Sequence, residues 1–162
     1  MAGEVKFHLG IKALVRNEKG QVLLLKVRKE EVPDHPGPAY WDIPGGRIQW
    51  GSVVRDKGTN QIQWDQTVRG TLEREVQEET GLTGIESIEP FSFVISNISY
   101  PVDTGETVAL LLRSYICVIP RIGDITLSPE HTEYGWFSPA EAAVLLAVKY
   151  PSEFCEAITR LH

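Results

Sequence analysis

Glu75, Glu78 and Glu79 stand three and four positions apart, a spacing that places three carboxylates on one face of a helix. Like charges at this spacing destabilise a helix by about 0.2–0.5 kcal/mol per pair in water, and partial burial adds a desolvation cost. A bound hard cation offsets both costs, because Mg²⁺ and Mn²⁺ prefer carboxylate oxygens. The alternative is a solvated acidic face on which Arg74 pairs with Glu78.

The segment that carries these acids has a helical pattern over residues 67–80. Val68, Leu72 and Val76 recur every four positions, and Gly81 supplies a stop. Glu75 and Glu78 border this apolar stripe, and Glu79 projects inside it. We therefore expect a helix that packs through the stripe and holds its acids at the edge of the buried surface.

Two stretches of the chain together resemble the Nudix hydrolase family. Residues 41–46 read WDIPGG, and residues 74–82 read REVQEETGL. The family's box reads G-x5-E-x7-R-E-U-x-E-E-x-G-U, where U is aliphatic, and residues 74–82 match every specified position of its second half. The resemblance extends over residues 7–137.

The first half of the box departs from the family pattern. Counting forward from Gly46, the first glutamate of the box is replaced by Ser52, and counting back from Arg74 it is replaced by Gln66. The box therefore reads as split by an insertion of about fourteen residues near positions 52–65, which is either a small hairpin beside the site or a tolerated surface loop. Asp56 and Asp65 are candidates to replace the missing acid.

The resemblance implies a pyrophosphohydrolase that cleaves a nucleoside diphosphate linked to another moiety, with Mg²⁺, or Mn²⁺, as its cofactor. The missing glutamate leaves a second hypothesis open, a non-catalytic Nudix-like module that binds nucleotides. A structural α+β domain with an incidental acidic helix is the third hypothesis, and the match over residues 74–82 argues against it.

The resemblance also implies roles for particular residues. Glu75 is a metal ligand or the general base, and Arg74 orients the carboxylates by ion pairing. An acid placed before a tryptophan completes the site, and Glu130 is the candidate, with Glu133 as its alternative. The metal ligands that the resemblance implies are the Gly46 carbonyl, Glu75, Glu78, Glu79 and Glu130.

Substrate contacts are expected from three further residues. Arg28, at the end of a predicted strand, matches a position that meets substrate phosphate in the family, although an edge-strand charge is the alternative. Trp41 and Tyr100 are aromatic candidates for stacking on a base, as are Trp50 and Trp64, although aromatic residues are more often part of a core.

Strand and helix patterns alternate irregularly along the chain, which favours an α+β domain. We expect one Nudix-type domain over residues 1–162, an α/β/α sandwich with a mixed central sheet. Predicted strands cover residues 7–15, 22–28, 40–43, 85–98 and 107–119, and predicted helices cover residues 67–80, 139–147 and 152–161, the last two with Ser138 and Ser152 as caps.

The amino-acid composition limits the classes of partner that the protein is expected to bind. Sixteen Lys and Arg residues against 22 Asp and Glu residues give a net charge of −6. This charge disfavours binding to duplex nucleic acid or to an anionic membrane surface. No apolar run approaches the roughly 20 residues of a membrane span. We expect a small-molecule nucleotide as partner, a monomer or a homodimer, and, from two isolated cysteines and no signal-peptide pattern, a cytoplasmic location.

Overall fold

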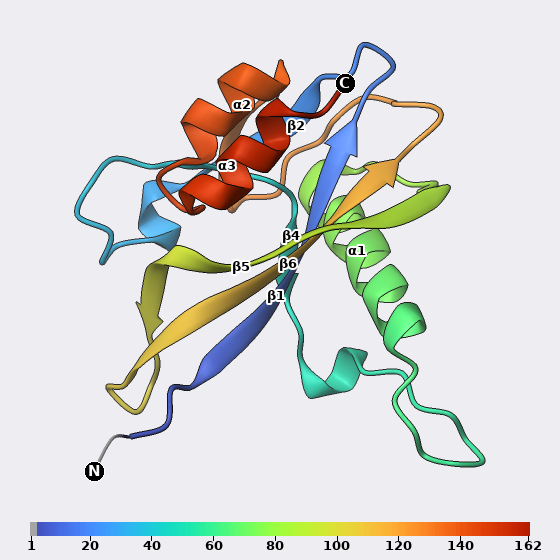
Figure 1. Ribbon diagram of the computed structural model, residues 1–162, viewed down its shortest axis with the longest axis vertical. Helices are drawn as coiled ribbons and strands as arrows, with labels where there is room; N and C mark the ends of the chain where they lie inside the picture. The colour runs from blue at the N-terminus through green and yellow to red at the C-terminus, as the bar shows by residue number, and fades with distance from the viewer. Residues whose placement is uncertain (1–2) are drawn as a thin grey trace.

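The computed structural model describes residues 3–162, which contain a seven-stranded mixed sheet (Figure 1). Its main path runs β3-β2-β1-β6-β5, with β4 paired to β1 and β7 paired to β2. β1 and β6 are parallel, and the other paired strands are antiparallel. The strands are β1 Phe7–Arg16, β2 Val22–Val27, β3 Trp41–Asp42, β4 Gly45–Arg47, β5 Ser87–Pro101, β6 Thr107–Val118 and β7 His131–Phe137.

Helices cover both faces of the sheet (Figure 1). α1, Trp64–Thr80, packs on one face through Val68, Leu72 and Val76. α2, Pro139–Leu146, and α3, Ser152–Thr159, cover the other face. The short 3-10 helices Lys29–Glu31 and Trp50–Ser52 lie in the connections. This is the predicted α+β sandwich around a mixed sheet.

Strand β1 contributes side chains to the hydrophobic cores on both faces of the sheet, because its side chains alternate between the two faces. Ile11, Ala13 and Val15 join the core under α1, whereas Leu14 joins the core under α2 and α3. Lys12 points to the same face of the sheet as Leu14, so its charged side chain is buried on the side of α2 and α3. There it is only 7% exposed.

Most predicted elements are present, with differences at their ends. α1 begins at Trp64, three residues before the predicted start. Ser138 caps α2 as predicted and accepts a hydrogen bond from the Glu141 amide. The predicted Ser152 cap is wrong, because the N-cap of α3 is Pro151 and no side chain caps the helix.

No strand is predicted over residues 131–137, but β7 occupies them. Residues 131–137 pair antiparallel with β2, so that Glu133 lies on a strand opposite Lys26. A single bridge joins Arg55 to Ile62 in the segment predicted as an insertion. None of the helices in residues 3–162 is long and apolar enough to cross a membrane.

Candidate active site

The C-terminal half of α1 carries the acids, and two glycines of β4 bring the chain against them. Gly45 has φ 148°, and a Cβ there would collide with the Ile11 carbonyl. A Cβ at Gly46 would overlap the Glu75 carboxylate. Glycine is therefore needed at position 45, where a Cβ would meet the backbone of β1, whereas a Cβ at position 46 would displace the end of the Glu75 side chain.

Glu79 is the buried acid of the three, at 7% exposure. One of its oxygens accepts a hydrogen bond from the Gly45 amide at 2.9 Å. Burial raises the pKa of Glu79 to about 8, although the nearby Lys12 ammonium and the Gly45 amide oppose the rise. A cation at this carboxylate would favour its ionised form.

Glu75 and Glu78 differ in environment although they share a helix face with Glu79. Arg74 lies 2.9 Å from an oxygen of Glu75 and 3.3 Å from an oxygen of Glu78. Glu75 is partly buried, and burial raises its pKa against the pull of Arg74. The Glu78 side chain is 59% exposed. Arg74 thus bridges an inner and an outer carboxylate.

Glu130 reaches the same place from the turn that precedes β7. Among residues 3–162, Glu79, Glu130 and His131 offer ligand atoms within 4.8 Å of one another. Ser128 Oγ lies 3.2 Å from His131 Nδ1. Burial, together with the ammonium groups of Lys12 and Lys149, lowers the pKa of His131 to about 4, so the imidazole is neutral at pH 7.

Glu79, Glu130 and His131 line a cavity of about 210 Å³, whereas Arg74, Glu75 and Glu78 do not. Of the residues implicated from the sequence, Gly46, Glu79, Tyr100 and Glu130 line it. Glu75 stands behind Gly46 at its edge. The cavity is also lined by residues that sequence reasoning did not single out, namely Gly10, Lys12, Val27, Glu31, Val32, Tyr40, Asp42, Gly45, Arg47, Leu110, Leu112, His131 and Lys149.

Other residues expected at the site lie elsewhere. Arg28 donates from Nε to the Pro129 carbonyl at 2.6 Å, beside the turn that carries Glu130. Trp41 packs edge-on against Phe137, with ring centroids 5.2 Å apart. Neither lines the cavity. Glu133 pairs with Lys26 at 3.1 Å, and Trp50 and Trp64 line a separate apolar hollow.

The two positions that replace the first glutamate of the box also lie outside the cavity. Ser52 caps its own 3-10 helix through Gln49, and Gln66 is exposed in the first turn of α1. Asp56 accepts hydrogen bonds from Gly58 and Thr59 within its own loop. Asp65 is exposed in the first turn of α1.

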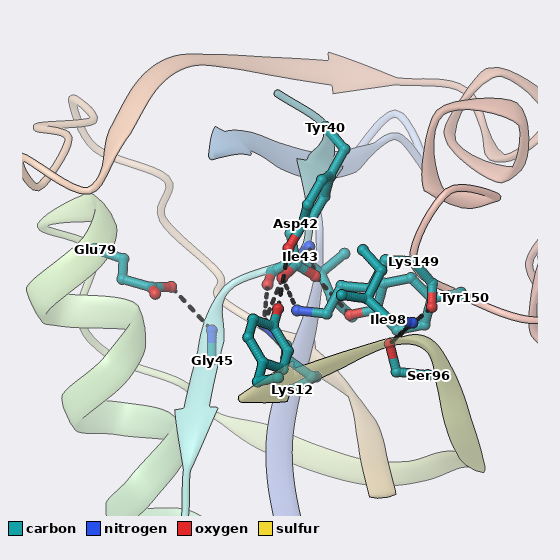
Figure 2. Close-up of polar contacts among 11 residues, drawn as sticks. Lys12, Tyr40, Asp42, Ile43, Gly45, Glu79, Ser96, Ile98, Lys149 and Tyr150 are labelled. Atoms are coloured by element: carbon teal, nitrogen blue, oxygen red, sulfur yellow. Dashed lines mark hydrogen bonds and ion pairs between the residues drawn. The ribbon is translucent and has the colours of Figure 1, made fainter. Parts of the chain in front are cut away.

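Asp42 lies at the centre of a buried charge network (Figure 2). Asp42, Lys12 and Lys149 all line the cavity. Lys12 Nζ lies 2.8 Å and Lys149 Nζ 2.5 Å from Asp42 Oδ2. The Tyr150 hydroxyl and the Ile43 amide donate to Asp42 Oδ1. Burial alone would raise the pKa of Asp42, but the two ammonium groups hold it well below its usual range.

The sequence offered only a partial signal for this network. Asp42 lies inside the WDIPGG segment, and its position next to the box motif is the one sequence feature that points to it. Lys12 and Lys149 are separated by 137 positions, and neither stands in a motif. Their convergence depends on the tertiary fold alone.

A family model for the NUDIX domain matches residues 6–157. The chain belongs to the Nudix family. Among solved structures, the MutT protein from Methanosarcina mazei Go1 is 25% identical, with TM-score 0.60, over 99% of this chain and 96% of that one.

Two further Nudix-fold neighbours share the architecture at lower identity. An Ap4A hydrolase from C. elegans is 19% identical, with TM-score 0.54, over 96% of both chains. The E. coli dihydroneopterin triphosphate pyrophosphohydrolase is 16% identical, with TM-score 0.58, over 96% of this chain and 95% of that one. A comparison with curated protein sequences found no significant match. The protein is thus a Nudix pyrophosphohydrolase, and Nudix hydrolases generally use a divalent metal.

Proposed function

We propose that this Nudix enzyme hydrolyses a pyrophosphate bond in a nucleoside diphosphate linked to another moiety, with Mg²⁺, or Mn²⁺, as its cofactor. The observation that carries the proposal is the convergence of Gly46, Glu75, Glu79 and Glu130 from three parts of the chain on one cavity edge. Carboxylate and carbonyl oxygens are the donors that these hard cations prefer.

The residues fit such a cation. Glu79, Glu130 and the neutral His131 offer ligand atoms within 4.8 Å of one another. By the resemblance to the family box, the Gly46 carbonyl, Glu75 and Glu78 would complete the ligand set, although the Glu78 side chain is 59% exposed. When bound, the cation supplies charge neutralisation at the phosphate oxygens and polarises the attacking water. Glu79 is fixed in advance by the Gly45 amide, which lowers the cost of ordering the site.

Glu75 has two roles open to it in this site, ligand or general base. Its carboxylate is partly buried beside Gly46, and burial raises its pKa, which makes it a stronger proton acceptor than an exposed glutamate. Arg74 holds one Glu75 oxygen at 2.9 Å and so fixes the direction of the other. Tyr40 and Tyr100 also line the cavity and are the aromatic candidates for contact with a base.

A non-catalytic nucleotide-binding module is the alternative, and the absence of the first box glutamate at Ser52 and Gln66 favours it. A panel of nucleoside triphosphates, dinucleoside polyphosphates and nucleotide sugars, incubated with Mg²⁺ and analysed by mass spectrometry, separates the two. We expect cleavage of at least one member to a nucleoside monophosphate and loss of that activity with a chelator. Binding without turnover across the panel would establish the alternative.

A further inference from the structure

The turn between α2 and α3 delivers Lys149 into the cavity. Ser96 Oγ and the Asn97 amide donate to the Lys149 carbonyl at 3.0 and 2.8 Å. The Asn97 side chain donates to the carbonyls of Ala147 and Tyr150. The edge strand β5 therefore clamps this turn, and the Lys149 side chain points toward Asp42 (Figure 2).

The Lys149 ammonium has more N–H donors than there are hydrogen-bond acceptors around it. An ammonium carries three N–H donors, and Lys149 gives one to Asp42, with no other hydrogen-bond acceptor among residues 3–162. Lys12, in contrast, donates both to Asp42 and to the Ile43 carbonyl. Lys149 is only 5% exposed and lines the cavity. Two of its donors are thus left for water or for a ligand in the cavity.

The surroundings of Lys149 suit a flat heterocycle better than a phosphate. Tyr40, Tyr100, Leu110 and Leu112 line the cavity with aromatic and apolar surface. The other cations that line it already have partners, since Lys12 meets Asp42 and Arg47 meets His8. The Tyr40 and Tyr100 hydroxyls lie 3.0 Å apart and hydrogen-bond to each other. A phosphate needs several charged donors around it, whereas a base needs apolar walls and a few placed polar groups.

We propose that Lys149 is a specificity-determining residue that donates to an oxo group on the edge of the substrate's base. This inference rests on the proposed function and names its substrate class. Guanine presents O6 and N7 as acceptors and uracil or thymine presents O4, whereas adenine and cytosine present an amino group at the matching position. An amino group at that position is itself a hydrogen-bond donor, so it could not accept a hydrogen bond from the Lys149 ammonium. The enzyme therefore prefers oxo bases.

Steady-state hydrolysis of GTP, ATP, UTP and CTP with Mg²⁺ tests this, with kcat and KM measured separately. A hydrogen bond from a charged group predicts a preference of about ten- to 100-fold in kcat/KM for GTP over ATP and for UTP over CTP. The preference should lie mainly in KM. Lys149→Met should abolish it. Tyr150→Phe, which also removes a donor to Asp42 but does not line the cavity, should retain it.

A change on the ligand keeps the test valid if Lys149→Met fails to fold. The triphosphate of 2-aminopurine riboside lacks the O6 of guanine, so the wild-type enzyme should lose the same factor on it as on ATP. Equal kcat/KM for GTP, ATP and the 2-aminopurine nucleotide would overturn the inference while leaving pyrophosphate hydrolysis intact. Absence of hydrolysis of every nucleotide would instead count against the proposed function.

A phosphate bound at Lys149 is the other source of an acceptor, and inorganic pyrophosphate with Mg²⁺ distinguishes it. We expect its inhibition constant to be unchanged in Lys149→Met. A rise in that constant, matched by equal losses on all four triphosphates, would show that Lys149 binds phosphate and would overturn the assignment to the base.

Discussion

At the scale of single residues, Asp42 is the group on which most buried charge depends. It is 4% exposed and faces two buried lysines. Burial works against the charge of Lys12, but the Asp42 carboxylate keeps the pKa of Lys12 above its ordinary value. Such a network adds little net stability when complete, yet losing one member leaves an uncompensated buried charge.

Asp42→Asn should therefore destabilise the fold by about 3–5 kcal/mol, the usual cost of breaking a buried pair. Chemical denaturation at pH 7 measures this free energy of unfolding. Glu106→Gln is a matched control, since it breaks the exposed pair with Lys6, which water and salt screen, and should cost far less. Similar losses in the two variants would contradict a central role for Asp42.

The same variant has a pH signature. The pKa of Asp42 is lower in the folded state than the value of about 3.9 in an unfolded chain. Its contribution to stability is therefore fully present above about pH 4 and is lost as the pH falls below that value. The difference in stability between wild type and Asp42→Asn should be constant from pH 5 to 8 and should shrink below about pH 4.

At the scale of elements, the approach of β4 to α1 sets the site. Gly46→Ala leaves the Gly46 carbonyl in place but forces the Glu75 carboxylate aside. Because misplacement of a reacting group by about 1 Å can cost about 100-fold in rate, we expect a loss of that size in kcat with little change in melting temperature. Gly51→Ala, where an added Cβ meets nothing within 4 Å, is the control and should behave as wild type. Full activity in Gly46→Ala would contradict the placement of Glu75 at the site.

The elements differ in how well their sequences predict them. Helix α1 was predictable because Val68, Leu72 and Val76 repeat at the helical period and are buried as expected. Strand β7 was not, because Thr132, Glu133 and Tyr134 are all exposed and leave no alternation between buried and exposed positions. The acidic residues were predictable from spacing, whereas the Asp42 network was not, since its lysines meet only through the sheet and the α2–α3 turn.

At the scale of the whole molecule, the cavity joins the two layers. α1 provides Glu79 at one end, beside the glycines of β4, and the turn between α2 and α3 provides Lys149 at the other (Figure 2). Lys12 and Asp42 lie between them and connect both ends electrostatically. Under the proposed function, the end with Glu79 serves hydrolysis and Lys149 serves recognition of the base.

The proposed function requires Glu75 to act in hydrolysis, and the rate of a folded Glu75→Gln variant measures that role. This change keeps size and helix propensity but removes the charge, and α1 still packs through its apolar stripe. Loss of a general base costs about 10²–10⁴-fold in rate. We predict that Glu75→Gln cleaves the best nucleotide substrate with Mg²⁺ at least about 100-fold more slowly than wild type. Glu73→Gln, exposed on the same helix and paired within residues 3–162 only with Arg69, should be as fast as wild type. Equal rates for wild type and Glu75→Gln would contradict the account.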